Sequence, residues 1–252
     1  MKKSLHILII FIFLPLLLQS ATRSDIKIIE ASEDIRYLSQ KIAKDYLFYY
    51  KYPEQYKVKK ALITSLNDLA EDLRMIASAT EDVDTKSILE FLSYSKGEIS
   101  DMVSQEPNEE NAALILDHSE TLLEGADSIE NMHTYDFSSE EKMIMLTKRF
   151  EYLMQRVLKY YIALNSGFKN PTNKNYFKES ITKIEFNISE LTKYQYPSDI
   201  KELQTNLISY WQTNREFLKN EDKIFIPKLM FISISYLEDI ISKLELYHNK
   251  NQ

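Results

Sequence analysis

Glycine is almost absent from this chain, and its scarcity restricts the folds that the chain can form. The sequence of 252 residues contains 3 Gly and 6 Pro. A β-rich protein needs Gly and Pro at many tight turns, whereas long helices joined by short loops need little of either. The hydrophobic fraction of 44% and the charged fraction of 27% are those of an ordinary globular protein. We therefore expect an all-α fold.

Apolar residues recur at helical spacing, and the whole pattern occurs twice. One stripe, shifted by 115 positions, gives a second apolar stripe. The two stripes are Ile28, Ala31, Ile35, Leu38, Ile42, Tyr46, Tyr49 and Met143, Leu146, Phe150, Leu153, Val157, Tyr161, Leu164. An alternative explanation is that the chain is an ordinary long-helix protein without a duplication, because any heptad pattern matches itself when it is shifted by a multiple of seven residues. The loop prolines Pro53 and Pro171 also correspond, at an offset of 118, and favour duplication.

This duplication predicts two tandem antiparallel four-helix-bundle modules, at residues 22–134 and 138–252. The expected helices are about 25–51, 54–79, 84–104, 109–133, 139–166, 173–195, 198–220 and 223–248. Ser138 and Glu141 have the spacing of a capping box at the start of the fifth helix. The segment from Thr134 to Phe137 is the expected boundary, and each module should fold when the chain is cut there. The sequence leaves open whether the modules stack end to end or side by side.

Residues 1–21 have the pattern of a signal peptide. Lys2 and Lys3 precede an apolar run from Leu5 to Leu18, and a small-residue exit ends at Ala21. This pattern predicts a periplasmic or secreted protein, with an uncleaved membrane anchor as the alternative. The absence of Cys excludes disulfides, thiol catalysis and Cys-ligated zinc. A net charge of −7 disfavours nucleic acid as a partner.

The segment Ile35–Lys44, which reads IRYLSQKIAK, carries the one specific motif. It resembles the first helix of the N-terminal sensory domain of type IV pilus methyl-accepting chemotaxis transducers (the PilJ-type domain). That motif commonly reads G-R-Q-R-M-L-S-Q-R-x-A-K, and related periplasmic four-helix domains occur in nitrate/nitrite sensor kinases. The resemblance implies a sensory or binding module for a small ligand, or for a membrane-bound transducer or sensor kinase.

In the nitrate sensors, an arginine of this helix binds the anion at the two-fold axis of a dimer, and that position falls on Arg36. The resemblance therefore implies a site for a small anion at Arg36, Ser39, Gln40 and Lys41, and a homodimer through the first helix. In this chain Glu33 replaces the glycine of the motif, and Arg36 corresponds to Glu151 in the second copy. Judged from the residues alone, Arg36 would lie at the edge of the bundle, paired with Glu33 or with a neighbouring helix.

Two Glu-x-x-His pairs, Glu130 with His133 and Glu245 with His248, lie 115 residues apart. Bundles with di-iron sites use this spacing, but they add inward-facing Glu residues at mid-bundle. The alternative is a His that faces the free carbonyls at a helix C-terminus. The sequence contains no catalytic triad, phosphate loop or zinc-protease motif, so we expect neither an enzyme nor a cofactor. The hypotheses are a sensory or binding module, a non-catalytic helical scaffold and, third, a metal-binding bundle.

Overall fold

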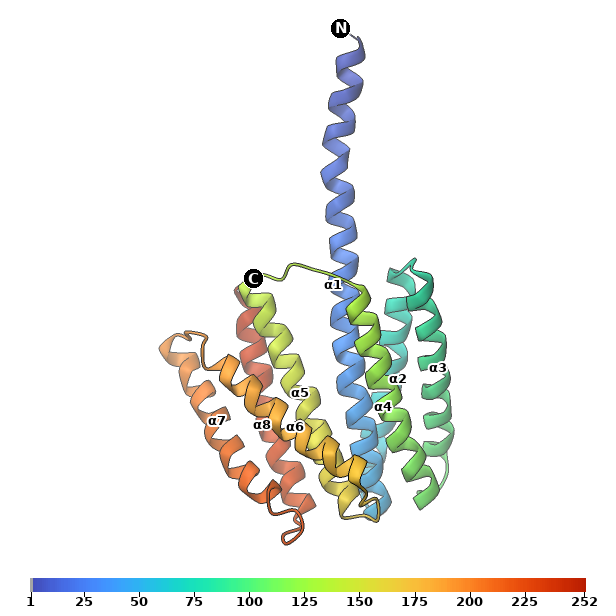
Figure 1. The fold of residues 1–252 in the computed structure, drawn as a ribbon, viewed down its shortest axis with the longest axis vertical. Helices are drawn as coiled ribbons and strands as arrows, with labels where there is room; N and C mark the ends of the chain where they lie inside the picture. Colours follow the sequence, from blue (N-terminus) through green and yellow to red (C-terminus); the bar gives the residue numbers. More distant parts are fainter. Residues whose placement is uncertain (1) are drawn as a thin grey trace.

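The computed structural model describes residues 2–252, with side chains from Ser24 onward, and the described chain contains only helices. The eight helices are α1 (Lys2–Lys51), α2 (Tyr56–Ala79), α3 (Val83–Ser104), α4 (Glu109–Met132), α5 (Ser139–Leu164), α6 (Pro171–Leu191), α7 (Ser198–Leu218) and α8 (Pro227–Lys250) (Figure 1). The all-α prediction is therefore confirmed. The side chains of the expected targeting segment, residues 1–21, lie outside the described ones.

Among the described residues, no helix has both the length and the apolar character needed to cross a membrane.

Side-chain caps explain where α3, α4, α5 and α6 begin. The capping box at the start of α5 is confirmed: Ser138 Oγ accepts from the Glu141 N–H at 3.2 Å, and Glu141 Oε2 accepts from the Ser138 N–H at 2.7 Å. The loop from α5 to α6 contains Gly167 at φ 103°, a left-handed conformation that glycine adopts without steric cost. The observed helix ends lie within four residues of the predicted ones, except at the start of α1.

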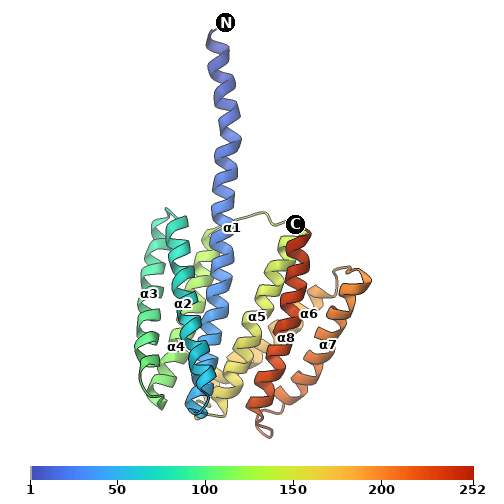
Figure 2. The ribbon, with the colours of Figure 1, turned by 180° about the vertical axis from the view of Figure 1, so that it is seen from behind.

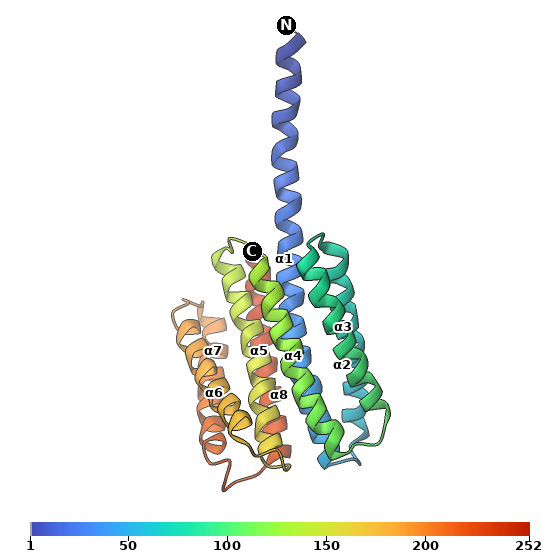
Figure 3. The same ribbon diagram turned by 45° about the vertical axis from the view of Figure 1, so that its right-hand side comes forward.

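The helices form two sets that lie side by side, α1–α4 (the first half) and α5–α8 (the second half) (Figures 1 and 2). α1 and α5 run parallel and pack against each other, and so they join the halves. α1 also packs on α2 and α4, and α5 packs on α6 and α8. α4 packs on α1, and side-chain ion pairs join it to α5. Figure 3 shows these three helices together. The sequence left open whether the two halves stack end to end or side by side, and the structure shows them side by side.

Burial separates these two central helices from the outer ones. Each outer helix buries one stripe, as α2 does with Leu62, Leu66, Leu69, Leu73 and Ile76. By contrast, α1 and α5 are buried around most of their circumference, polar side chains included. One continuous hydrophobic core includes residues of both halves. The independence of two four-helix modules therefore stays a prediction, while the structure shows that they share the α1–α5 contact.

Candidate functional site

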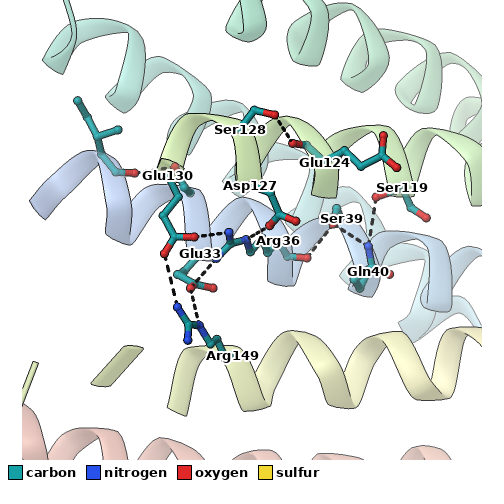
Figure 4. Close-up of polar contacts among 12 residues, drawn as sticks. Glu33, Arg36, Ser39, Gln40, Ser119, Glu124, Asp127, Ser128, Glu130 and Arg149 are labelled. Carbon is teal, nitrogen blue, oxygen red and sulfur yellow. Dashed lines mark hydrogen bonds and ion pairs between the residues drawn. The ribbon is translucent and has the colours of Figure 1, made fainter. Parts of the chain in front are cut away.

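Arg36 lies at the contact of α1 with α4, surrounded by carboxylates (Figure 4). Its Nη1 donates to Glu33 Oε1 at 2.6 Å, one turn earlier on α1. Its Nε donates to Asp127, and its Nη2 donates to Glu130, both on α4. The Arg36 side chain is only 7% exposed. Each of the three guanidinium nitrogens thus donates one charge-assisted bond within the protein.

Glu33 and Glu130 also face the second half. From α5, Arg149 Nε lies 3.6 Å from Glu33 Oε1, and Arg149 Nη2 lies 3.7 Å from Glu130 Oε1. Glu33 is fully buried, and its Oε2 has no hydrogen-bond partner. Burial raises the pKa of Glu33 to about 7, although Arg36 opposes the shift. A proton on Glu33 would leave two carboxylates facing two arginines, which balances the charge of the cluster.

The resemblance also placed Ser39, Gln40 and Lys41 in the anion site, but their side chains have separate partners. Ser39 Oγ donates to the Arg36 carbonyl at 2.7 Å, and Gln40 Nε2 donates to Ser39 Oγ at 3.1 Å and to the Ser119 carbonyl at 3.2 Å. Lys41 points toward α2 and bonds Asp45 at 2.7 Å and Ser65 at 2.9 Å. The four side chains therefore do not converge on one ligand position.

The structure corrects the expected setting of Arg36. The sequence placed it at a bundle edge, but it is buried, because α1 is enclosed by α2, α4 and α5. Its pairing with Glu33 and with a neighbouring helix agrees with the alternative derived from the residues alone. An anion at Arg36 would have to displace carboxylates that already use its donors. Within the chain, α1 packs against α5 as well as against α2 and α4.

A second ion cluster joins α5 to α4 and was not anticipated. Glu120 accepts from Arg156 Nη2 at 2.6 Å and from Lys159 Nζ at 2.5 Å. Lys159 is fully buried and also donates to Ser119 Oγ at 2.9 Å. Burial alone would raise the pKa of Glu120, but Lys159 and Arg156 outweigh it and lower the pKa to about 2. Lys159 corresponds to Lys44 at the repeat offset of 115, a sequence signal that indicates only the duplication.

A third cluster is centred on Glu151, the repeat counterpart of Arg36. Lys148 Nζ donates to Asp34 Oδ1 at 2.5 Å across the α1–α5 contact. Burial, with Glu245 and Glu238 nearby, raises the pKa of Glu151 to about 8. Acidic groups therefore outnumber their basic partners at this part of the contact.

All ion pairs that join the halves, among the described side chains, have one polarity. The cation comes from the second half and the carboxylate from the first. The cations are Lys148, Arg149, Arg156, Lys159 and Lys228, and the carboxylates are Glu33, Asp34, Glu54, Glu120 and Glu130. The two halves are therefore complementary in charge.

The repeated histidines contact the first helix of their own half. His133 Nδ1 lies 2.9 Å from Asp25 Oδ1, and His248 Nδ1 lies 2.5 Å from Glu140 Oε2. Asp25 and Glu140 are themselves 115 positions apart, so the duplication preserves the whole contact. No group of three or more His, Asp or Glu suited to a metal ion occurs among the described side chains. Each histidine thus links the C-terminal end of the last helix of its half to the first helix, α4 to α1 and α8 to α5.

No family model matches this chain, and no curated protein or solved structure matches it either. The relation to the PilJ-type domain therefore remains a resemblance carried by residues 35–44.

Proposed function

We propose that this protein is an exported, non-catalytic binding module, a single-chain counterpart of a dimeric sensory domain. In this proposal α1 and α5 take the places of the two first helices of a dimer. The supporting observation is their parallel packing inside one chain, at positions related by the repeat offset of 115. The module would recognise a small ligand, or a membrane-bound transducer or sensor kinase, without chemical turnover.

The polarity of the ion pairs supports pairing within the chain. Two first halves brought together through α1 would place Glu33, Asp34 and Glu120 of each copy opposite like charges, which is unfavourable. The same pairing of two second halves would oppose Lys148 and Arg156 with themselves. Pairing of one half with the other satisfies both sets. We therefore propose that the working unit is one chain, in place of the homodimer expected from the resemblance.

A non-catalytic helical scaffold is the second candidate, and the setting of Arg36 favours it. An arginine held by three carboxylates stabilises the packing of α1 on α4 and is not free to bind an anion. A scaffold would use the same fold and the same cross-half contacts, but it would bind no small molecule.

A thermal-shift measurement with nitrate, acetate, benzoate and phosphate tests the binding function. We expect at least one anion to raise the Tm with increasing concentration, because a ligand that binds only the folded state stabilises it. Arg36→Ala should keep that shift, since Arg36 already has internal partners. The unliganded variant should lose about 3 kcal/mol of stability, because the buried Glu33 and the partly buried Glu130 lose their partner.

The matched control is Glu151→Ala, at the repeat position that corresponds to Arg36. It should lower the Tm little, because Glu151 is repelled by Glu245 and Glu238. Loss of the anion shift in Arg36→Ala, with the unliganded Tm unchanged, would restore Arg36 as the anion site. If no anion moves the Tm of the native protein, the scaffold becomes the better description.

A further inference from the structure

A groove of about 450 Å³ runs between α1 and α2, away from the Arg36 cluster. Its apolar part includes Leu38, Ala61 and Tyr37, and Thr64 and Ser65 contribute hydroxyls. The volume lies within the range of pockets that hold small molecules. Apolar surface with a few polar groups around it suits a compact organic molecule better than a fully hydrated inorganic ion.

The groove is basic although the protein is acidic. Three lysines line it, Lys41, Lys57 and Lys60, against one carboxylate, Asp68. Lys57 and Lys60 are exposed and form no ion pair with any described side chain. The whole chain has a net charge of −7, so this cationic surplus is local. A negative ligand would meet two lysines that form no ion pair with Asp68 or with any other described carboxylate.

Lys41 is held in a defined position at the groove. Its ammonium donates to Asp45 Oδ2 at 2.7 Å and to Ser65 Oγ at 2.9 Å. An ammonium has three donors, so one donor remains for a ligand. Asp45 and Ser65 are buried and fix the lysine head, which reduces the entropy cost of ordering it on binding.

From these contacts we propose that the α1–α2 groove binds a small organic carboxylate, with Lys57 and Lys60 facing its charge and Leu38 and Tyr37 packing on its apolar body. The proposal rests on the binding function above and names the ligand class and its site. The third donor of Lys41 would bond one carboxylate oxygen, as a charge-assisted hydrogen bond.

A rival basic groove lies between α2 and α3, with a volume of about 630 Å³. Arg74, Lys86 and Lys96 line it together with Glu90. Two of its three cations are already engaged: Lys86 Nζ donates to Glu81 Oε2 at 2.9 Å, and Arg74 Nε donates to the Ala70 carbonyl at 2.9 Å. Because these cations have partners, this groove is the weaker site for an anion and serves as the control.

Titration calorimetry of the full chain with benzoate, and with benzamide as its uncharged isostere, tests the proposal. Benzoate should bind and benzamide should bind at least about tenfold more weakly. Lys57→Gln combined with Lys60→Gln should weaken benzoate binding about tenfold, because two exposed charges that attract the carboxylate are lost. The helical content and the Tm without ligand should not change, since both lysines are exposed. Lys86→Gln combined with Lys96→Gln, which removes the same charge from α3, should leave benzoate binding unchanged.

Any of the following results would overturn the proposed carboxylate site in the α1–α2 groove. Equal binding of benzamide would mean that the carboxylate is not recognised. Unchanged affinity in the Lys57 and Lys60 variant, or lost affinity in the Lys86 and Lys96 variant, would move the site elsewhere and leave the binding function intact. If benzoate does not bind but nitrate or phosphate raises the Tm, the organic ligand class is wrong and the binding function stands. If no anion has an effect, both fail.

Discussion

Charged side chains at the contact between the halves differ in how completely they are compensated. Glu120 faces Arg156 and Lys159, which hold its pKa near 2. Glu151 is half-buried near Glu245 and Glu238, and its pKa rises to about 8 although Lys148 opposes the shift. The same contact therefore contains one carboxylate that favours folding when ionised and one that opposes it.

The free energy of unfolding should reveal both carboxylates through its pH dependence. For Glu151, the folded pKa of about 8 lies above the ordinary glutamate value of 4.5, so between these values the folded state keeps a proton that the unfolded state has lost. Its contribution to stability is therefore full below about pH 4.5 and is lost as the pH rises toward 8. In Glu151→Gln, the unfolding free energy should fall less steeply with pH between 4.5 and 8, because the variant lacks the one proton that the native folded state keeps. At pH 8.5 the variant should be more stable than the native protein, as measured by urea unfolding.

Glu120→Gln is the control of opposite sign. The depressed pKa of Glu120 stabilises the folded state above pH 4.5, and this contribution is lost as the pH falls toward 2. The variant should be less stable than the native protein at pH 7, and the difference should shrink at pH 3. Parallel pH profiles for the native protein and Glu151→Gln would contradict the assigned pKa of Glu151.

Gly97 and Gly125 both lie within helices, but helix packing leaves space for a side chain at only one of them. Gly97 in α3 has open space where a Cβ would stand. Gly125 in α4 faces α3, and a Cβ there would lie 2.4 Å from Leu92 Cδ2 and 3.0 Å from Leu92 Cγ. Leu92 is fully buried, so it has little room to move. The absence of a side chain at Gly125 therefore sets the close approach of α3 and α4.

Alanine substitutions at these glycines should change stability in opposite directions. Gly97→Ala should add about 1 kcal/mol, because alanine is the better helix former and meets no atom. Gly125→Ala gains the same propensity but displaces Leu92, and overpacking costs about 1–3 kcal/mol. Its net effect should be a loss of up to about 2 kcal/mol, measured by thermal unfolding. Equal stabilisation by both would mean that α3 and α4 separate easily.

The whole molecule is held together across α1 and α5 by a common core and by ion pairs of one polarity. α1 is enclosed by helices of both halves, so separating the halves would expose apolar surface as well as buried charges such as Lys159. The segment Thr134–Phe137 lies between α4 and α5 and has no helical structure, so the backbone can be cut there without interrupting a helix.

A protease site inserted in residues 134–137 tests how the halves depend on each other. The sequence alone predicts two pieces that fold separately. The shared core predicts that the cut halves stay associated and elute as one particle in size-exclusion chromatography. The particle should persist at 1 M NaCl, because buried pairs are screened much less than exposed ones. Elution as two separate folded fragments would restore the independent modules.

The sequence by itself determined the helical class, the helix positions and the repeat, because helix periodicity and the scarcity of glycine act locally along the chain. It also placed Ser138 and Glu141 at a cap, and it anticipated Glu33 as a partner of Arg36, one turn away. Only the tertiary structure decided that α1 pairs with α5. Polar residues such as Arg36 and Lys159 look like exposed edge positions in one helix, and their burial arises only when helices from both halves surround them. The complementarity of the halves is likewise a property of the contact, since no single helix carries both members of the cross-half pairs.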